Sequence, residues 1–390
     1  MKRFLFLLLA LPFLLQQYPL VAQTVSGIVF HDKNGNKQQD RGEPGIPGVA
    51  VSDQVGVVLT DAEGRFQLEA TDLFNTIFIS LPDGYQGDFW QVRAPELSFP
   101  LRQDQAPQSF RFIHASDTHV DSLNLSRMAR FRQMADSIGA AFVIVSGDLI
   151  RDALRVTEPV ARAYYEMYLG EIGKFSMPVF SGMGNHELFG IERDKSLVSE
   201  KHPLYGKNMY RHYLGPDYYS FNFGGLHFVS VDAMQYKNLY YYGGIDSLQL
   251  AWLEKDLAVI PKDMPVITFN HIPLVSPGFS FQDFENDDFY GPSLLNINGK
   301  LQHRHIVSNF ADLKKVIGGR PYPLALSGHY HAAQEGYFVG AEPRFAQTSA
   351  ITRPDRFDFN GFPVRSGFTV YEVSGGKVVK SWFVPLNLKQ

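Results

Sequence analysis

Five short clusters of Asp, Asn and His recur in a fixed order along the 390-residue chain, and each follows an apolar run typical of a buried β-strand. The clusters are Asp117-Thr118-His119, Gly147-Asp148, Gly184-Asn185-His186-Glu187, Asn270-His271 and Gly328-His329-Tyr330-His331. The runs before them are Phe110–Ile113, Phe142–Val145, Pro178–Phe180, Val266–Phe269 and Leu324–Leu326. Open α/β sheets bind ligands at the carboxyl ends of their strands. The pattern therefore predicts an α/β domain with a polar site at one edge of the sheet.

These clusters have the chemistry of a metal site. Carboxylate, amide and imidazole groups, in a chain without cysteine, suit borderline divalent cations such as Mn, Fe, Zn, Co or Ni. Two such cations about 3.5–4 Å apart can share one carboxylate and clamp a displacement at phosphorus, with a metal-bound water as the nucleophile. Asp148 directly follows a long apolar run and is the best candidate for the shared carboxylate. The residues predict a two-metal hydrolase.

The order D-x-H, G-D, G-N-H-E, H and G-H-x-H resembles that of the calcineurin-like metallophosphoesterases, over about residues 108–390. The resemblance implies a four-layer α/β/β/α sandwich around a dinuclear centre. The implied ligands are Asp117, His119, Asp148 and His331 for one cation, and Asp148, Asn185, His271 and His329 for the other. It also implies that His186 contacts the phosphate and protonates the leaving oxygen, a general-acid role suited to imidazole.

Two branches of that family fit the sequence less well. Purple acid phosphatases place a tyrosine ligand shortly after the shared aspartate, whereas Leu149, Ile150 and Arg151 follow Asp148 here. The 5′-nucleotidases share the Gly-Asn-His-Glu block but need a large C-terminal substrate domain, and only a short β-segment at Gly367–Val384 follows the last motif. Phosphomonoesterase and phosphodiesterase activities both remain open, because both use the same metal clamp.

The first residues have the layout of a secretory signal peptide. Lys2 and Arg3 precede the apolar run Phe4–Leu15, and the small residue Ala22 marks the expected cleavage site. The run is shorter than the roughly 20 apolar residues that span a bilayer, and no later stretch is long enough, so no transmembrane segment is expected. An exported chain without cysteine fits a bacterial periplasm, outer surface or extracellular location.

Residues 23–106 are predicted to form a small all-β, Ig-like sandwich, joined to the phosphoesterase domain at 107–390 after the signal peptide at 1–22. Short alternating runs separated by turn residues support this prediction. They are Val25–Phe30, Gly48–Ser52, Gly56–Thr60, Gly64–Leu68 and Thr76–Leu81. The region resembles calcium-binding B-type repeats and the β-domain that precedes some bacterial metallophosphoesterases. Phe99–Gln108 contains two prolines and is predicted to be a linker.

One loop of this β-region has oxygen ligands at the spacing of a calcium loop. Asp32, Asn34, Asn36, Asp40 and Glu43 occupy positions 1, 3, 5, 9 and 12 of such a loop. The glycine expected at position 6 is replaced by lysine. The loop is therefore either a calcium site or an Asn/Asp/Gly turn that binds nothing.

Helices and strands are predicted to alternate after the linker, as in a layered α/β domain. Helices are expected at Leu125–Ile138, at Glu158–Phe175, at Ser247–Val259 after the cap Asp246, and from Ser308 or Asn309 to Gly318. Tyr218–Phe223 and Leu226–Asp232, joined by Gly224-Gly225, predict a hairpin and hence a mixed sheet.

Two long segments without a motif, Leu188–Pro216 and Ser276–Arg304, are expected to shape the substrate pocket. Their Phe and Tyr residues favour an apolar or aromatic leaving group, as in a nucleotide or a lipid ester. With a net charge of −4 the chain is not expected to bind bulk nucleic acid. The oligomeric state is left open.

A different class of function is a surface protein that binds the cell envelope or a glycan and carries a non-catalytic phosphoesterase-like domain. The presence of all seven candidate ligands and of His186 favours the enzyme. His114 lies inside an apolar run and is interpreted as a core residue. Five further histidines match no motif position and are assigned no role: His202, His212, His227, His303 and His305.

Overall fold

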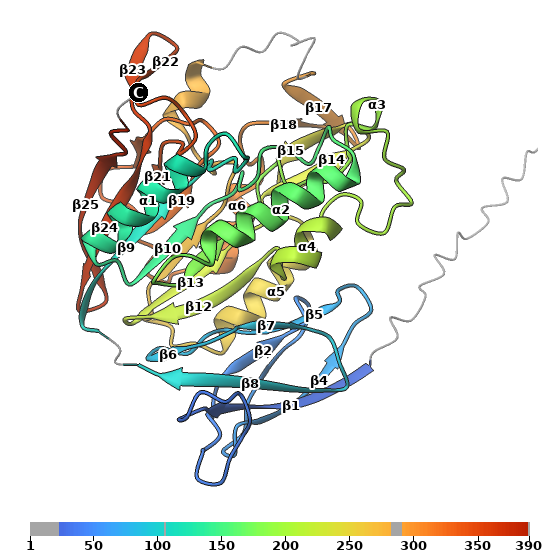
Figure 1. The fold of residues 1–390 in the computed structure, drawn as a ribbon, viewed down its shortest axis with the longest axis vertical. Coiled ribbons are helices and arrows are strands. Elements are labelled where there is room, and N and C mark those ends of the chain that lie inside the picture. Colours follow the sequence, from blue (N-terminus) through green and yellow to red (C-terminus); the bar gives the residue numbers. More distant parts are fainter. Residues whose placement is uncertain (1–22, 105–106, 282–290, 389–390) are drawn as a thin grey trace, which may run out of the picture.

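The computed structural model describes residues 23–104, 107–281 and 291–388, which form a β-sandwich packed against a larger α/β domain (Figure 1). The predicted signal peptide at 1–22 lies outside the described residues. No helix in the described ranges is long and apolar enough to cross a membrane.

The N-terminal region consists of two four-stranded sheets, ordered β4-β1-β8-β6 and β3-β2-β5-β7. The strands are β1 (Gln23–His31), β2 (Ala50–Ser52), β3 (Val57–Leu59), β4 (Arg65–Ala70), β5 (Thr76–Ile79), β6 (Tyr85–Gln86), β7 (Trp90–Val92) and β8 (Glu96–Gln103). Side chains alternate between buried and exposed along β4, as expected for a strand with one face on a core. The predicted small β-sandwich is consistent with this arrangement.

The predicted linker at Phe99–Gln108 was wrong over its first half. Residues 99–103 belong to β8, which pairs in parallel with β1. Leu97, Phe99 and Leu101 alternate into the sandwich core and are buried, so apolar alternation outweighs Pro100 in this strand.

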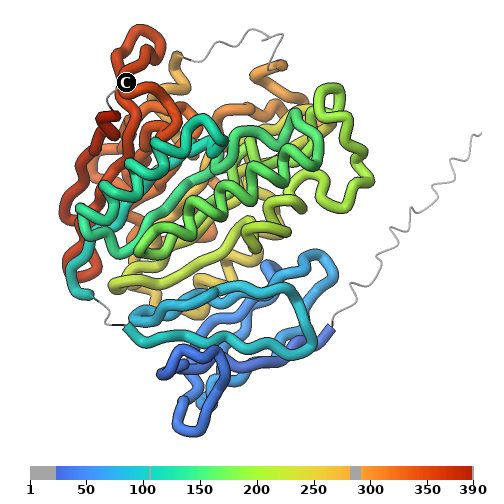
Figure 2. Tube along the Cα trace, in the orientation of Figure 1, coloured from blue at the N-terminus to red at the C-terminus, as the bar shows by residue number. Residues whose placement is uncertain are grey.

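The α/β domain has two sheets that pack face to face. The first has the order β11-β10-β9-β24-β25 and the second β12-β13-β16-β19-β21-β20. Their strands are β9 (Ser109–Ala115), β10 (Phe142–Val145), β11 (Val179–Ser181), β12 (Tyr219–Phe223), β13 (Leu226–Ser230), β16 (Val266–Phe269), β19 (Leu324–Ser327), β20 (Gln334–Gly336), β21 (Arg344–Gln347), β24 (Gly367–Ser374) and β25 (Lys377–Pro385). Figure 2 shows the C-terminal strands, in red, beside β9.

Aromatic side chains fill the space between the two sheets. Phe180 and Phe221 stack with ring centroids 3.7 Å apart, and Phe112 meets Phe228 edge-on at 5.5 Å. All four are buried. Aromatic burial of this kind is a major contribution to core stability.

Helices cover the outer faces of both sheets and complete the predicted four layers (Figure 1). Phe131 of α1 packs on Phe368 of the first sheet, and Phe310 of α6 packs on Phe345 of the second. The helices are α1 (Leu125–Ile138), α2 (Glu158–Ile172), α3 (Arg193–Ser196), α4 (Asn208–Leu214), α5 (Ser247–Ala258) and α6 (Phe310–Ile317). The predicted cap is confirmed, because the Asp246 carboxylate accepts a hydrogen bond from Gln249 N.

The remaining strands form small hairpins around the edges of the two sheets. They are β14 (Met234–Lys237) with β15 (Tyr240–Gly243), β17 (Leu294–Ile297) with β18 (Lys300–His303), and β22 (Phe357–Phe359) with β23 (Phe362–Val364). A short 3₁₀ helix, η1, spans Pro277–Phe281. The hairpin predicted at Gly224-Gly225 is confirmed as β12–β13, and the sheet is mixed.

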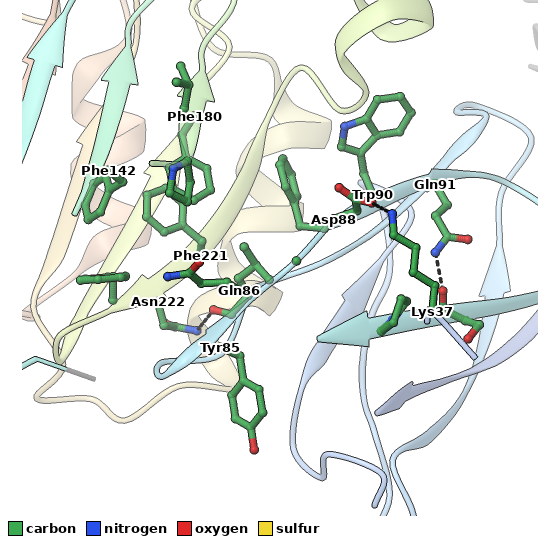
Figure 3. Close-up of a pocket in the computed structure, with 18 residues that line it drawn as sticks. Lys37, Tyr85, Gln86, Asp88, Trp90, Gln91, Phe142, Phe180, Phe221 and Asn222 are labelled. Carbon is green, nitrogen blue, oxygen red and sulfur yellow. Dashed lines mark hydrogen bonds and ion pairs between the residues drawn. The ribbon is translucent and has the colours of Figure 1, made fainter. Parts of the chain in front are cut away.

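A cavity of about 560 Å³ lies where the β-sandwich meets the α/β domain (Figure 3). Phe142, Phe180 and Phe221 line it from one side and Asp88 and Trp90 from the other. Its α/β wall includes the first residues of β10 and β11. The candidate ligands follow the opposite, carboxyl ends of these strands, so this cavity is not the predicted site.

Candidate metal centre

The five motif segments lie at the carboxyl ends of β9, β10, β11, β16 and β19, as the sequence predicted. Strands β9, β10 and β11 are parallel to one another in the first sheet, and β16 and β19 are parallel in the second. Their carboxyl ends therefore face the same edge of the sandwich. Side chains from both sheets meet there.

The first cluster joins Asp117, His119, Asp148 and His331. Each offers one ligand atom, and these atoms lie within 4.8 Å of one another. His331 Nε2 is 3.0 Å from Asp117 Oδ1 and 3.3 Å from His119 Nε2. His119 Nε2 is 3.6 Å from Asp148 Oδ2. Nitrogen and oxygen donors that converge in this way fit one divalent cation.

The second cluster joins Asp148, His271 and His329 within the same 4.8 Å limit. His271 Nε2 lies 3.0 Å from Asp148 Oδ2, and His329 Nδ1 lies 3.2 Å from His271 Nε2. Asp148 therefore belongs to both clusters. This is the position that two neighbouring cations need for a shared carboxylate.

Asn185 provides a further oxygen beside these clusters. Its side chain is buried, and its Oδ1 has no hydrogen-bond partner among the described residues. Leaving a buried carbonyl oxygen unpaired costs about 1–3 kcal/mol, so a missing partner calls for an explanation. The next residue fixes the loop to the cluster, because His186 N donates to Asp148 Oδ1 at 3.0 Å. A bound cation would supply the missing partner of Asn185.

Glycines let the motif segments approach one another closely. A Cβ on Gly147 would lie 2.6 Å from the His271 side chain, and one on Gly184 would lie 2.2 Å from Asp148 N. Gly147 also has a φ of 98°, a conformation that favours glycine. Each glycine therefore permits a contact that places Asp148.

Glu187 holds the loops after β10 and β11 together. It is fully buried, and four backbone N–H groups donate to its carboxylate: Gly184, Asp148, Leu149 and Ile150. Burial, followed by the charge of Asp148, raises the pKa of Glu187 to about 7. The four N–H donors oppose this effect and favour the ionised form. No role was assigned to Glu187 from the sequence.

The titration behaviour of the cluster reflects burial and opposed charges. Burial lowers the pKa of His119 and His329 well below the usual value, and neighbouring histidines lower it further. Burial also disfavours a charge on His271, but Asp148 and Asp117 outweigh it and raise its pKa to about 9. Although burial opposes it, the charges of His271 and His186 hold the pKa of Asp148 well below normal. Neutral imidazoles and ionised carboxylates are the forms that bind metal.

His186 lies beside the clusters without belonging to either. Its Nδ1 is 2.6 Å from Arg151 O, and because a carbonyl can only accept, Nδ1 carries a proton. Its Nε2 lies 3.7 Å from Asp148 Oδ2, and its ring meets His119 edge-on. Nε2 therefore points toward the site, where a proton on it can be transferred.

Comparison with known proteins assigns the chain to a family. Residues 110–333 match the family described as calcineurin-like phosphoesterase, and residues 32–116 match the N-terminal domain of such proteins. The chain belongs to the calcineurin-like phosphoesterase family. It is therefore a phosphoric ester hydrolase of the metallophosphoesterase class, as predicted, and the family implies divalent metal ions.

Similar proteins include a curated relative and solved structures. A "Probable cyclic nucleotide phosphodiesterase" of Rhodococcus erythropolis (strain PR4 / NBRC 100887) is 24% identical over 282 residues, which cover 68% of this chain and 80% of the relative. A dimetal phosphatase from Danio rerio is 13% identical, with a TM-score of 0.44, over 71% of this chain and 99% of its own. The purple acid phosphatase PPD1 of yellow lupin is 13% identical, with a TM-score of 0.40, over 93% of this chain and 69% of its own.

The family assignment leaves two further side chains at the centre without a role. His305 Nδ1 lies 2.7 Å from His329 Nε2, and Arg353 Nε donates to His331 Nδ1 at 2.7 Å. Neither belongs to a motif.

The other unassigned histidines have structural surroundings. His114 is a core residue, as predicted: it is fully buried in β9 and bonds to Ser146 Oγ at 2.8 Å. His202 and His227 pair with Glu158 and Asp256. The rings of His212 and His303 contact Tyr213 and Phe279.

The candidate calcium loop is held by its own hydrogen bonds. Asp32 accepts from the backbone N–H groups of Gly35 and Lys37, and Asp40 Oδ2 accepts from the side-chain amides of Asn34 and Asn36. Glu43 accepts from Lys33 N and Asp40 N. The calcium site stays a prediction, because a turn of this kind either stands alone or rearranges around a cation.

Proposed function

We propose that the protein hydrolyses a small phosphomonoester or phosphodiester at two divalent cations. Asp117, His119 and His331 would complete one site with Asp148, and Asn185, His271 and His329 the other. The observation that supports this most strongly is that Asp148 is shared between two groups of converging ligand atoms. The cations would be chosen from Mn, Fe, Zn, Co and Ni, which suit this donor set.

When bound, the cations supply Lewis acidity and an activated water at neutral pH. The chain's own residues do the remaining work. Asp148 fixes the distance between the two sites, while Glu187 fixes Asp148 through the backbone. In its protonated form His186 would donate Nδ1–H to Arg151 O and hold a second proton at Nε2 for the leaving oxygen. Arg151 is half-exposed beside the site and offers a cation for the phosphate.

A phosphodiester with an apolar or aromatic leaving group is the preferred substrate class. The name of the Rhodococcus relative supports a diester, and a nucleotide is one candidate. Exposed aromatic residues on the segments near His271 and His331 support an apolar group. Phe281 and Phe362 are each about half exposed and lie with ring centroids 5.4 Å apart. A lipid ester also fits this surface.

Export to a bacterial periplasm, outer surface or extracellular space belongs to the same proposal. It rests on the sequence layout of residues 1–22 and on the absence of cysteine. Mass determination of the mature N-terminus after expression in a bacterium would test it. Cleavage near Ala22 is the expected result, and an intact N-terminus in the soluble fraction would contradict export.

The catalytic proposal is tested with residues 23–390, stripped of metal and reloaded separately with Mn, Zn, Fe, Co or Ni. Turnover of bis(4-nitrophenyl) phosphate is compared with that of 4-nitrophenyl phosphate. We expect metal-dependent hydrolysis, faster with the diester, and a loss of at least about 100-fold in Asp148→Asn, since outer-shell changes alone cost 10–100-fold. Asp263→Asn, at an exposed carboxylate outside the site, should behave as wild type. Absence of turnover with every metal would instead favour the envelope- or glycan-binding alternative.

The role of His186 has its own signature. A general acid contributes about 10²–10⁴-fold, and it matters most when the leaving oxygen is a poor leaving group. His186→Gln should therefore slow the release of an alkyl alcohol far more than that of 4-nitrophenolate. An equal loss with both leaving groups would show that His186 does not protonate the leaving oxygen.

A further inference from the structure

Beyond His271, the described part of the segment between β16 and α6 reaches the metal centre again near its end. It carries the β17–β18 hairpin, and His305 follows β18 by two residues. His305 Nδ1 lies 2.7 Å from Nε2 of His329. The planes of the two rings differ by 23°. This pair connects the residues after β18, which belong to no motif, to a candidate ligand.

The two nitrogens of His329 face in different directions. Nδ1 is 3.2 Å from His271 Nε2 and belongs to the cluster around Asp148. Nε2 faces His305 instead. His329 therefore offers Nδ1 to a cation and has Nε2 free for a hydrogen bond.

This orientation determines where the proton of His329 must be. A neutral imidazole carries one N–H, and the nitrogen that binds a cation must be the one without it. His329 can bind through Nδ1 only if the proton is on Nε2. That N–H then needs an acceptor, and the nearest one is the lone pair of His305 Nδ1. Ligating histidines almost always donate their second N–H in this way.

His305 is held in place by a buried support. Its ring and that of His329 both meet the ring of Tyr241 edge-on, at 6.3 Å. Tyr241 is buried, and the guanidinium of Arg304 lies over its ring, with Cζ 4.4 Å from the ring centroid. Arg304 itself is only 1% exposed. A side chain with such neighbours has little freedom to turn away from His329.

We propose that His305 is a positioning residue for the second cation. It accepts the Nε2–H of His329, selects the tautomer with a free Nδ1, and fixes the orientation of the ring. The proposal rests on the dinuclear function proposed above. It also gives the residues that follow β18 a role in building the site.

Metal binding to the metal-free protein of residues 23–390 tests this directly. Calorimetric titration with Mn²⁺ and metal counting after gel filtration would be applied to wild type, His305→Leu, His305→Asn and His303→Asn. Leu removes the acceptor, whereas the Oδ1 of Asn can take the place of Nδ1. His303→Asn removes an imidazole from the same hairpin and is the matched control. Circular dichroism establishes that each variant is folded.

We expect two cations in the wild type and in His303→Asn. In His305→Leu the affinity for one cation should fall by about 10–100-fold while the other is unchanged, and His305→Asn should restore most of the loss. Unchanged affinities in His305→Leu would overturn the proposal, as would an equal loss in His305→Asn. Two cations bound without any ester hydrolysis would defeat the proposed function alone. A wild type that binds no cation would defeat both.

Discussion

Left-handed backbone conformations mark the candidate ligands at the residue scale. Five of the seven have positive φ values: Asp117, His119, Asp148, His329 and His331. Such conformations cost non-glycine residues of the order of 1–3 kcal/mol and persist only where the surroundings enforce them. Here they follow the last residue of a buried strand and direct the side chains at a common point. The strain is therefore part of how the site is built.

His114 makes the stability depend on pH. Burial lowers its pKa to about 3 from the ordinary 6.5, so between these values the unfolded chain takes up a proton that the folded chain does not. The free energy of unfolding therefore falls as pH is lowered from about 6.5, by up to about 1.4 kcal/mol per unit. In His114→Gln this contribution should vanish. Urea unfolding at pH 7, 6 and 5 measures it.

The matched control for this prediction is His212→Gln, at an exposed histidine, which should follow the wild-type pH dependence. Since other histidines titrate in the same range, the informative quantity is the difference in slope between variant and wild type. Parallel curves for His114→Gln and wild type would contradict the prediction.

The sequence indicated the candidate ligands because each lies in a short motif directly after an apolar run. It could not reveal His305, because that residue lies 24 positions before His329 and meets it only through the path of an intervening segment. Glu187 is the last residue of the Gly-Asn-His-Glu motif, but its role depends on four backbone N–H groups that only the folded loops bring together.

At the scale of elements, the loops after β10 and β11 act as one unit through Glu187. Gln at this position keeps the size but replaces one acceptor oxygen by an NH₂ group, which would face two backbone N–H donors. Glu187→Gln should therefore lower the free energy of unfolding by about 1–3 kcal/mol, the cost of unpaired buried polar groups. Denaturant unfolding of the metal-free protein measures this.

The control is Glu200→Gln, at an exposed carboxylate that pairs with Arg193. This substitution should change the free energy of unfolding by less than about 1 kcal/mol. A Glu187→Gln variant as stable as wild type would contradict the bracing role.

Prediction of the elements depended on their length and pattern. The central strands of the α/β domain are continuous apolar runs, and α1 was predicted with its observed ends, Leu125–Ile138. Strands β6 and β7 have two and three residues and were not predicted, because so few positions cannot show an alternation of apolar and polar residues. Strand β8 was misread because a proline suggested a linker, although its alternate residues enter the core.

At the scale of the whole molecule, specific hydrogen bonds join the β-sandwich to the α/β domain. The Asp83 carboxylate accepts from the backbone N–H groups of Gly224 and Gly225, both at 2.9 Å. Gln54 Nε2 donates to the buried Asp217 at 2.8 Å. Neither sequence motifs nor composition indicated this interface, because its polar partners are more than 140 residues apart. The β-sandwich therefore supports the sheet that carries β16 and β19.

We expect this interface to make the two domains unfold together. Trp252 of α5 is 1% exposed, its Nε1 donates to Ser52 Oγ of β2, and its ring packs on Phe78 of β5. We expect one calorimetric transition for wild type. Trp252→Ala should cost about 3–5 kcal/mol, as for other buried aromatic truncations, and should split the transition because it removes a contact between domains. Trp382→Ala, a truncation of a half-buried tryptophan on β25, should keep a single transition at a moderately lower temperature. Two resolved transitions in the wild type would instead show that the β-sandwich is an independent module, attached to the enzyme without stabilising it.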